Sequence, residues 1–352
     1  MRISRLIGAA VAASLALTIS ACSSAEPTAE PAPAEGATAD DDAAADDATE
    51  EPLETIEVNF GYIPDFNGTS LLAIAEDQGL WEKHALDVTT SSFTNGPLQI
   101  QALGTGDLDF GYIGPGAFWL PASGQAKIVA INTLGQSDRV VAQAGITSME
   151  DLRGKTVAVP EGTSGDMILT LALAEAGMTK DDIQVASMEP SAIVAALASK
   201  QVDGAGFWYP PLATVKEQVP DLVELAKNSD FEDSVSFPNA FVAGNDVVEG
   251  EPEMVERVLA ALRDAMAFRA ANLDETIALT AEFNNLELAA VEGDVENVQV
   301  LSLEEIDQFT EDGTVDRWLA GMVDYFVGAG RLTDPVEPSE FYLGDLFLAA
   351  GE

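Results

Sequence analysis

Hydrophobic and polar positions switch repeatedly between two periods over residues 55–250. Apolar residues at alternate positions or in short runs predict strands at 56–63, 86–91, 109–113, 127–133, 156–159, 183–188, 204–207 and 241–244. The segments between them predict helices at 69–78, 97–103, 164–176 and 191–198. Thr69 or Ser70 is the predicted cap of the first helix, and the chain is mostly helical from residue 252 onward. Strands that alternate with helices predict open α/β sheets.

Three segments place small or hydroxyl residues between a predicted strand and a predicted helix, namely 64–70, 114–118 and 161–166. Ligands of open α/β sheets bind beyond the carboxyl ends of the strands, where free N–H groups and the positive ends of helices favour an anion. The candidate binding residues in these segments are Asp65, Phe66, Thr69, Gly114, Pro115, Gly116, Thr163, Ser164 and Asp166. The alternative is that their polar side chains only cap helices.

Aromatic residues gather at the same junctions: Tyr62, Phe66, Tyr112, Phe118, Trp119, Trp208 and Tyr209. Pockets for small molecules are often lined by aromatic rings with a few fixed polar groups. Among these rings, Tyr62, Phe66, Trp208 and Tyr209 are the candidates for ligand contact. Trp208 is the first choice because it leaves a strand just before two prolines, although a buried core tryptophan is the alternative.

Charged residues near the junctions could select the charge of a ligand. Asp65 and Asp166 lie inside the junctions, and Asp138 lies beside a predicted crossing between two halves of the chain. An ammonium group could pair with one of these carboxylates and stack on Trp208. Arg139 could clamp an oxyanion or form a salt bridge with Asp138. Solvated or helix-capping acids are the alternative.

Composition narrows the classes of function. The 352 residues include 60 Asp plus Glu and 16 Lys plus Arg, a formal net charge of −44, which argues against nucleic acid as a partner and against electrostatic docking on anionic lipid. One His and one Cys are too few for a histidine triad, a Cys–His pair, a Cys/His zinc site or a disulfide within the chain. We also expect no cofactor and no metal, and His84 is assigned no role.

The first residues are predicted to be a targeting signal. Residues 1–21 combine Arg2 and Arg5 with a short apolar run at 6–19, which is typical of a signal peptide and too short to span a bilayer comfortably. The following Ile19-Ser20-Ala21-Cys22 resembles the bacterial lipobox. That resemblance implies that Cys22 carries a lipid and attaches the mature protein to the membrane. An ordinary signal peptide with a chance cysteine is the alternative.

Residues 22–54 are predicted to form a disordered tether. The segment 23–54 has eleven acids and no Lys or Arg, with many Ala and Pro, so it cannot bury enough apolar surface to fold. An acidic metal-binding tail is the alternative. The remaining 49 acids and 14 basic residues leave the folded part strongly acidic as well, which would fit a high-salt habitat or an exposed position on the cell surface.

An ordered series of short motifs suggests a family. The motifs are Gly61-Tyr62, Leu71-Leu72-Ala73-Ile74-Ala75, Gly79-Leu80-Trp81, Gln101-Ala102-Leu103, Gly106-Asp107-Leu108-Asp109-Phe110-Gly111, Asp151-Leu152-Arg153-Gly154-Lys155-Thr156-Val157-Ala158, Gly162-Thr163-Ser164, Gln201-Val202-Asp203-Gly204 and Trp208. In order and spacing the series resembles the nitrate/sulfonate/taurine-type substrate-binding proteins of ABC importers. The resemblance covers roughly residues 55–330 and is not specific for the ligand.

The resemblance implies an α/β, two-lobed periplasmic-binding-protein type II fold with two crossover strands, no catalysis, and an ABC permease as partner. Lobe one would comprise residues 55–138 plus 241–352, and lobe two residues 139–240. Closure of the lobes about the crossings would trap a small solute between them. An aliphatic sulfonate or taurine-like molecule is the favoured solute, with helix ends for the sulfonate and Trp208 with an Asp for the amine. An organic cation or a pyrimidine-like heterocycle stays open.

Two other classes of function are weighed. An extracellular hydrolase could use the carboxylates of Asp107 and Asp109, which face the same side if they lie in a strand. A signalling or adhesion lipoprotein would bind no small solute at all. Stoichiometric binding without turnover separates the receptor from both.

Overall fold

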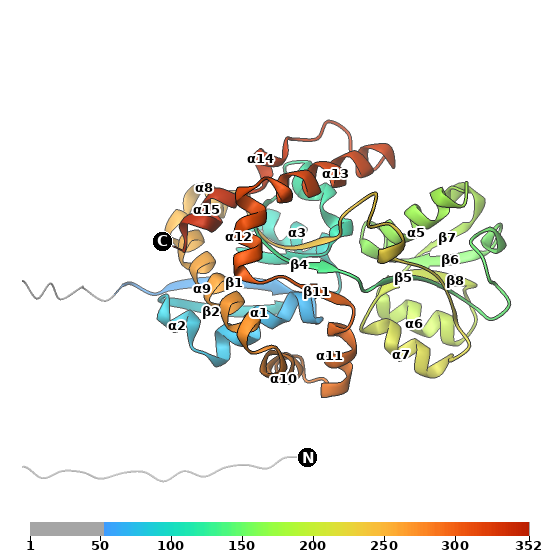
Figure 1. Ribbon diagram of the computed structural model, residues 1–352, viewed down its shortest axis with the longest axis horizontal. Coiled ribbons are helices and arrows are strands. Elements are labelled where there is room, and N and C mark those ends of the chain that lie inside the picture. Colours follow the sequence, from blue (N-terminus) through green and yellow to red (C-terminus); the bar gives the residue numbers. More distant parts are fainter. Residues whose placement is uncertain (1–52, 352) are drawn as a thin grey trace, which may run out of the picture. The chain divides into compact units, whose positions relative to one another are not determined.

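The computed structural model describes residues 53–351, which form one compact unit. The predicted signal peptide, Cys22 and all but the last two residues of the predicted tether lie outside the described residues. Two sheets divide the described part (Figure 1). We call the part around the six-stranded sheet lobe one and the part around the five-stranded sheet lobe two.

The sheet of lobe one mixes parallel and antiparallel strands. Its strands in spatial order are β11 (Val298–Val300), β4 (Lys127–Gly135), β10 (Pro238–Ala243), β3 (Phe110–Ile113), β1 (Ile56–Tyr62) and β2 (Leu86–Ser92). β1 pairs in parallel with β2 and β3, whereas β10 runs antiparallel between β3 and β4. The carboxyl ends of β1 and β3 therefore lie at the same edge.

The sheet of lobe two follows the same plan on a smaller scale. Its strands in spatial order are β7 (Gln184–Ser187), β6 (Thr156–Val159), β8 (Gly204–Trp208), β5 (Asp138–Ala142) and β9 (Val223–Lys227). β6 pairs in parallel with β7 and β8, and β5 runs antiparallel to β8 and β9. Figure 1 shows α5 (Ser164–Glu175) on one side of this sheet and α6 (Pro190–Ala198) and α7 (Pro211–Gln218) on the other.

Helices of lobe one come from both ends of the described chain. They are α1 (Phe66–Asp77), α2 (Leu80–Lys83), α3 (Gly96–Thr105), α4 (Trp119–Ala122), α8 (Asn245–Gly250), α9 (Pro252–Ala271), α10 (Leu273–Asn284), α11 (Leu288–Val295), α12 (Leu303–Glu311), α13 (Thr314–Gly328), α14 (Pro338–Phe341) and α15 (Gly344–Ala349). Single 3₁₀ turns are η1 (Pro115–Ala117), η2 (Glu150–Leu152), η3 (Lys180–Asp182) and η4 (Asn228–Asp230). Within residues 53–351, none of the helices combines the length and the apolar composition that a membrane span requires.

The chain crosses between the lobes twice, once from β4 into β5 and once from η4 back to β10 (Figure 1). The predicted α/β fold with two lobes and two crossover segments is therefore confirmed. β5 begins at Asp138 in the second sheet and β10 begins at Pro238 in the first. The residue bounds proposed for the lobes stay a prediction.

Buried apolar residues of both sheets explain why the pattern folds this way. In lobe one the Phe60 ring lies 5.6 Å from Phe110 and 5.7 Å from Phe241, centroid to centroid, so three neighbouring strands share one aromatic core. The long helix α9 packs against α1 and buries the guanidinium of Arg269, which donates to Asn132 Oδ1 of β4 at 2.7 Å and to the Asn132 carbonyl at 3.1 Å. These contacts fix the C-terminal helices on the first half of the chain.

Several predicted element bounds need correction. The first helix begins at Phe66 rather than at Thr69 or Ser70, because Asp65 is its N-cap and accepts a hydrogen bond from Gly68 N. A carboxylate is a strong helix N-cap, so the helix gains one extra turn. The short strands β9 and β11 were not predicted, because pairing with neighbours defines them more than their own residue pattern does.

Candidate functional site

Strand ends of both lobes meet around one small cavity. β1 and β3 end at Tyr62 and Ile113 in lobe one, and β6 and β8 end at Val159 and Trp208 in lobe two. The segments that follow them enclose about 30 Å³, which we call the inner cavity. The residues that line the inner cavity are Ile63, Asp65, Asn67, Gly96, Tyr112, Gly114, Pro115, Ala117, Gly135, Ser137, Asp138, Thr163, Ser164, Trp208 and Asn239.

The lining includes seven of the residues predicted from the sequence: Asp65, Gly114, Pro115, Asp138, Thr163, Ser164 and Trp208. Five of them come from the three predicted junctions, and Asp138 and Trp208 come from β5 and β8. Asp138 and Trp208 are direct partners in the antiparallel pair of β5 and β8, so their backbones lie side by side at the mouth of lobe two. The predicted convergence of the junctions on one site is therefore observed, whereas the role of each residue in binding stays a prediction.

The two lobes touch each other beside the inner cavity. A Cβ atom added to Gly116 of lobe one would lie 1.9 Å from the carbonyl carbon of Thr163 and 2.1 Å from the nitrogen of Ser164. Only a glycine allows this approach of backbone to backbone. The inner cavity has room for one or two water molecules in this closed arrangement. An organic solute therefore needs the lobes to separate before it can enter.

Two buried carboxyl groups surround the N-terminus of α1. Asp65 Oδ1 accepts from Gly68 N at 2.7 Å, and Asp294 Oδ2 accepts from Phe66 N at 2.7 Å. Burial, and then the nearby Asp294 carboxylate, raise the pKa of Asp65 well above its usual range. Burial also raises the pKa of Asp294 to about 6, an effect that the Phe66 N–H partly offsets. Asp65 and Asp294 at the start of α1 therefore both have raised pKa values, because burial disfavours their ionised forms.

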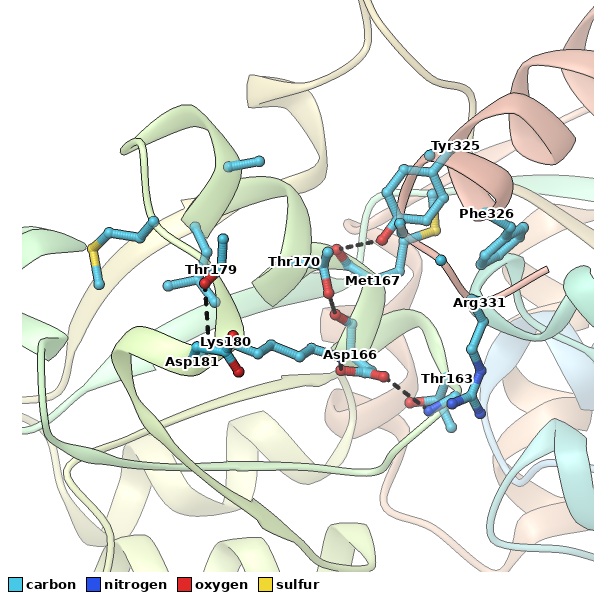
Figure 2. A pocket seen from close by; sticks show the side chains of 18 residues that line it. Thr163, Asp166, Met167, Thr170, Thr179, Lys180, Asp181, Tyr325, Phe326 and Arg331 are labelled. Carbon is cyan, nitrogen blue, oxygen red and sulfur yellow. Dashed lines mark hydrogen bonds and ion pairs between the residues drawn. The ribbon is translucent and has the colours of Figure 1, made fainter. Parts of the chain in front are cut away.

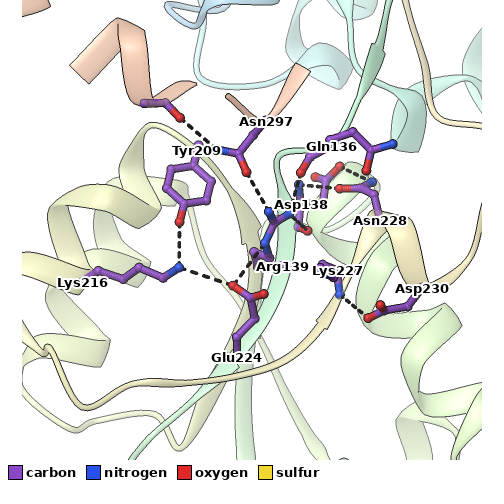
Figure 3. Close-up of polar contacts among 11 residues, drawn as sticks. Gln136, Asp138, Arg139, Tyr209, Lys216, Glu224, Lys227, Asn228, Asp230 and Asn297 are labelled. Carbon is purple, nitrogen blue, oxygen red and sulfur yellow. Dashed lines mark hydrogen bonds and ion pairs between the residues drawn. The ribbon is translucent and has the colours of Figure 1, made fainter. Parts of the chain in front are cut away.

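A third buried carboxyl group comes from lobe two. Figure 3 shows Asp138 beside Asn228, whose Nδ2 donates to Asp138 Oδ2 at 3.0 Å while its Oδ1 accepts from Asp138 N at 2.7 Å. Asp138 Oδ1 has no hydrogen-bond partner among residues 53–351. Burial raises the pKa of Asp138. The hydrogen bond from Asn228 and the nearby Ser164 hydroxyl, which makes no hydrogen bond to the carboxyl group in this arrangement, partly offset this rise. None of the described residues that line the inner cavity is Lys, Arg or His.

Arg139 does not reach the inner cavity. Its Nε donates to Glu224 Oε2 at 3.2 Å, and one guanidinium nitrogen donates to Asn297 Oδ1 of lobe one at 2.7 Å (Figure 3). Its other guanidinium nitrogen donates to two backbone carbonyls, those of Gln136 at 2.5 Å and Asp138 at 2.8 Å. Arg139 is therefore neither an oxyanion clamp nor a salt-bridge partner of the Asp138 carboxylate here. It ties the first crossing to both lobes.

Tyr209 belongs to the same polar group rather than to the cavity lining. Lys216 Nζ donates to the Tyr209 hydroxyl at 2.7 Å, and the Arg139 guanidinium lies 5.7 Å from the centre of the ring (Figure 3). The residue is half-buried and does not line the inner cavity. The predicted role of Tyr209 in ligand binding has no contact in this structure to support it.

Asp166 and Gly116 line a different hollow, which we call the side pocket. It has a volume of about 510 Å³ and lies between α5 of lobe two and the end of α13 of lobe one. Figure 2 shows Asp166 paired with Lys180 inside it. The Tyr325 hydroxyl of lobe one donates to the Met167 carbonyl at 3.3 Å. The charges of Asp166 and Lys180 thus satisfy each other, and the side pocket contains contacts between the lobes.

The remaining predicted residues of the first junction lie behind the inner cavity. The Tyr62 ring packs edge-on against Phe283 at 5.4 Å, centroid to centroid. Phe66 is buried in a small cluster with Ala281 and Val291. The Thr69 hydroxyl donates to the Ile63 carbonyl at 3.2 Å. These side chains of β1 and α1 pack against the C-terminal helices α10 and α11, and none of them lines the inner cavity.

The α5 junction presents a different surface to the inner cavity. Thr163 is the N-cap residue, but its hydroxyl donates back to the Pro160 carbonyl at 2.5 Å and makes no cap on the helix. The N–H groups of the first turn of α5 consequently have no side-chain cap, and such groups suit an acceptor oxygen. Ser164, the first residue of this helix, lines the cavity and can donate its hydroxyl.

Several lining residues were not predicted. The Tyr112 hydroxyl donates to Asn239 Oδ1 at 2.9 Å, and Asn239 Nδ2 donates to Thr133 Oγ1 at 3.1 Å, so these groups hold one another in place. Tyr112 belonged to the predicted aromatic group without being chosen. Asn239 and Asn67 follow no recognisable motif. Asp294 of α11 does not line the cavity, but it accepts from Phe66 N at the start of α1 and was not predicted either. Only the folded arrangement identifies them.

The two acids considered for a hydrolase lie apart from the inner cavity. Asp109 Oδ2 accepts from Asn59 N at 2.7 Å, and Asp107 Oδ2 accepts from Thr105 Oγ1 at 2.8 Å. Both residues precede β3, whereas the cavity follows its carboxyl end. Asp107 and Asp109 therefore do not line the inner cavity between the lobes.

Comparison with known proteins agrees with the geometry. Residues 67–276 match the family described as NMT1/THI5 like. A Brucella abortus protein, named only as a binding protein, is 55% identical over 296 residues, which cover 84% of this chain and 93% of that protein. The taurine-binding periplasmic protein of Escherichia coli is 28% identical over 185 residues, which cover 52% of this chain and 57% of that protein.

Solved structures share the fold. The alkanesulfonate-binding protein SsuA of Xanthomonas axonopodis, bound to MOPS, superposes with a TM-score of 0.66 at 22% identity, covering 83% of this chain and 99% of that one. The predicted resemblance to taurine- and sulfonate-type substrate-binding proteins is therefore confirmed at the level of family and fold. The chain belongs to the NMT1/THI5-like family, as a periplasmic-type solute-binding protein of ABC import.

Proposed function

We propose that this chain is the extracytoplasmic receptor of an ABC importer for a small solute that carries a protonated amine, with a taurine-like molecule as the first candidate. The observation that supports this proposal is the charge of the residues that line the inner cavity. Buried carboxyl groups of Asp65 in lobe one and Asp138 in lobe two line the same cavity, and its described lining has no basic side chain. A ligand ammonium between them would supply the missing positive charge.

The same arrangement makes solute capture depend on closure. With the lobes apart, solvent would reach each carboxylate. In the closed arrangement Asp65 and Asp138 are buried, and burial raises the pKa of each. A cation that bridges them would offset the desolvation, so the bound solute would favour the closed arrangement over the open one. The permease would then receive a protein whose shape reports that the cleft is loaded.

A taurine-like solute would also use the α5 end of the cavity. The uncapped N–H groups at the start of α5 and the Ser164 hydroxyl are suited to sulfonate oxygens. Trp208 borders the same space and could stack on the ammonium or on the carbon chain. Zwitterion binding thus fits one acidic end and one donor end of the inner cavity.

A second candidate is an organic cation or a pyrimidine-like heterocycle with an amino group. The lack of any basic residue in the described lining favours it, because a full sulfonate charge has no counter-ion there. Ring amines and amidine-like groups donate well to carboxylates, and Asn67 and Asn239 could complete their hydrogen bonds. An aliphatic sulfonate without an amine fits the charge of the site less well.

Calorimetry with three matched small probes tests the proposal. Taurine, ethanesulfonate and ethylamine differ only in which end group they keep. We expect binding to need the amine, so taurine or ethylamine binds and ethanesulfonate does not. Binding of ethanesulfonate alone would overturn the amine requirement. Recovery of each probe unchanged after long incubation, by mass spectrometry, tests that the protein binds without turnover, and a new product would support an enzyme instead.

We also propose that Cys22 anchors the protein to the outer face of the membrane through a lipid. The support is the lipobox-like run that ends at the single cysteine of the chain. Cys22→Ser should release the protein into the soluble fraction, and intact mass should show the loss of the lipid. A Cys22→Ser protein that stays in the membrane pellet would contradict the anchor without affecting the solute-binding proposal.

A further inference from the structure

A larger hollow opens directly beside the inner cavity. It has a volume of about 580 Å³, and we call it the outer groove. Ile63 of lobe one and Trp208 of lobe two line both spaces, and each side chain is at least nine-tenths buried. These two residues therefore form the partition between the carboxylates inside and the groove outside.

Both lobes contribute walls to the outer groove. Phe93 follows β2 and Leu286 follows α10, both in lobe one, whereas Val194 lies in α6 and Pro211 begins α7 in lobe two. Like the inner cavity, the groove exists in this shape only when the lobes are closed. A molecule in it would add contacts that form on closure, as a bound solute must if it favours the closed arrangement.

The chemistry of the groove differs from the rest of the chain. The sequence has 60 acidic residues, yet none of the described residues that line this groove is charged. Four of the lining residues are proline, which supplies stiff apolar walls. Phe93 is half-buried and Leu286 is 38% exposed, so both rim residues have apolar surface left to cover. An uncharged hollow on so acidic a protein points to an apolar occupant.

We infer that the solute has two parts: an ammonium group held by Asp65 and Asp138, and an apolar body, flat enough to lie along Trp208, that extends into the outer groove. This inference rests on the proposed amine receptor and, within it, favours an amine with an apolar body over the taurine-like candidate. The inner cavity alone holds about 30 Å³, far less than any organic body, whereas the groove adjoins it at Ile63 and Trp208. An arylalkylamine is the chemical class that matches both spaces.

The occupant is assigned to the solute because of where the groove begins. A partner protein would need an apolar patch on the outer surface of one lobe, and that patch would persist when the lobes open. This groove instead starts at the cavity partition and has walls on both lobes. Its continuity with the carboxylates fits the far end of the molecule that they bind.

A matched ligand series in calorimetry tests the inference on the full chain. The probes are ethylamine, phenethylamine and 3-phenylpropionate, which share a short chain and differ in ring and charge. We expect phenethylamine to bind about 10- to 100-fold more tightly than ethylamine, because the ring buries apolar area in the groove. We expect 3-phenylpropionate, with the ring but an anionic head, not to bind.

The outcomes separate the inference from the proposed function. Equal affinity for ethylamine and phenethylamine would overturn the groove assignment and leave the amine receptor standing. Binding of 3-phenylpropionate in place of both amines would overturn the amine receptor and, with it, the inference. Binding of taurine with exclusion of phenethylamine would support a small zwitterion and overturn the apolar body.

Variants at the rim test the location. Phe93→Ala and Leu286→Ala should each lower the preference for phenethylamine over ethylamine by about 3- to 10-fold, since each removes apolar contact area. Leu288→Ala is the matched control, because Leu288 is also an exposed leucine, at 48%, and lies two residues from Leu286 without lining the groove. A ratio that falls equally in Leu288→Ala, or stays constant in both rim variants, would overturn the assignment.

Discussion

The helices α1 and α5 begin in the same way and differ in how the N–H groups of their first turns are used. Each follows a parallel strand, each is twelve residues long, and each starts beside the inner cavity. At α1 the N-cap Asp65 accepts from Gly68 N and Asp294 accepts from Phe66 N, so two carboxyl groups cover the N–H groups. At α5 the N-cap Thr163 turns its hydroxyl to Pro160 and leaves the first turn without a side-chain cap.

This difference teaches that a strand–loop–helix junction does not by itself define an anion site. N–H groups at the start of α1 already donate to the carboxyl groups of Asp65 and Asp294, so the excess charge at this end is negative. In the first turn of α5 the acid Asp166 is paired with Lys180, and no side chain caps the helix, so its N–H groups are still available to an acceptor oxygen. A solute that lies between the two helices would be recognised by its ammonium group at the α1 end and by acceptor oxygens at the α5 end. Each prediction below removes one feature of that contrast.

The largest expected effect comes from removing the charge at the α1 end while keeping the cap. Asp65→Asn retains an N-cap side chain of nearly equal quality, because asparagine caps helices about as well as aspartate. Loss of one carboxylate from a buried pair with the ligand ammonium should weaken amine binding by about 3–5 kcal/mol, roughly 100-fold or more. Calorimetry with taurine and ethylamine measures it.

The matched control for Asp65→Asn is Asp107→Asn, which removes an exposed carboxylate far from the cavity. Circular dichroism and a melting curve should show that both variants fold, and Asp65→Asn should be at least as stable as the parent because a costly buried acid is gone. Unchanged affinity in Asp65→Asn would mean that the carboxylate does not hold the amine.

The second prediction concerns the pH dependence of stability at the same end. Burial raises the pKa of Asp294 to about 6, so the folded protein holds this proton more tightly than the unfolded chain does. The contribution of Asp294 to the free energy of unfolding should therefore fall as the pH rises from about 4 through about 6, by up to about 3 kcal/mol. Below about pH 4 the carboxyl is neutral in both states and this cost is absent.

Asp294→Asn isolates that contribution. Denaturant titrations of parent and variant between pH 4 and 7 give the difference in the free energy of unfolding at each pH. The variant should gain stability over the parent as the pH rises, with the change centred between the two pKa values. A difference that is constant with pH would show that Asp294 does not titrate with a raised pKa.

The third prediction removes the contact that brings the two helix ends together. Gly116→Ala places a Cβ atom within about 2 Å of the Thr163–Ser164 backbone, and backbone cannot move aside as a flexible side chain can. The lobes should then fail to close fully, at a cost of about 2 kcal/mol, or roughly 30-fold in affinity for any solute. Small-angle scattering should show less compaction on adding solute.

Gly104→Ala serves as its control, because an added Cβ at Gly104 in α3 meets nothing within 4 Å. This variant should compact and bind like the parent. If Gly116→Ala also binds and compacts normally, the close approach of Gly116 to lobe two is not needed for capture. Recognition of a solute by the two helix ends would then not require the lobes to approach as closely as they do in this structure.

The sequence supports part of this site because the part is local. Gly114, Pro115, Thr163 and Ser164 directly follow strands, and the carboxyl ends of parallel strands meet at one edge of their sheet. Their presence around one cavity follows from the strand pattern and from the family fold. The choice of Trp208 follows from the same logic, since β8 ends there.

The rest depends on segments that arrive late in the chain. Tyr62 and Phe66 were predicted to contact a ligand, but their rings pack with Phe283 of α10 and Val291 of α11 instead. Asp294 joins the α1 end from more than two hundred residues away. No local pattern tells which face of a strand end a C-terminal helix will cover, so these positions needed the fold.

The smallest expected effect, and the one that joins both helix ends, is at Trp208. It is the one of the four tryptophans that lines the inner cavity, and it also borders the outer groove. Trp208→Ala should abolish the change in tryptophan fluorescence on solute binding and weaken binding by about 1–3 kcal/mol, the scale of a lost buried aromatic contact. Trp208→Phe should recover most of the affinity, because a ring face remains, without recovering the fluorescence change.

Trp318→Phe is the matched control, since Trp318 packs against Phe309 at 5.3 Å on α13 and lines neither space. Its removal should lower total fluorescence and leave both the solute-induced change and the affinity intact. If Trp208→Ala binds as the parent does, the ring is only a core residue and the partition between cavity and groove carries no recognition. If Trp208→Phe loses as much affinity as Trp208→Ala, the indole N–H rather than the ring face makes the contact, and stacking on the ammonium or on an aromatic body is the wrong description of how the two ends of the solute are held.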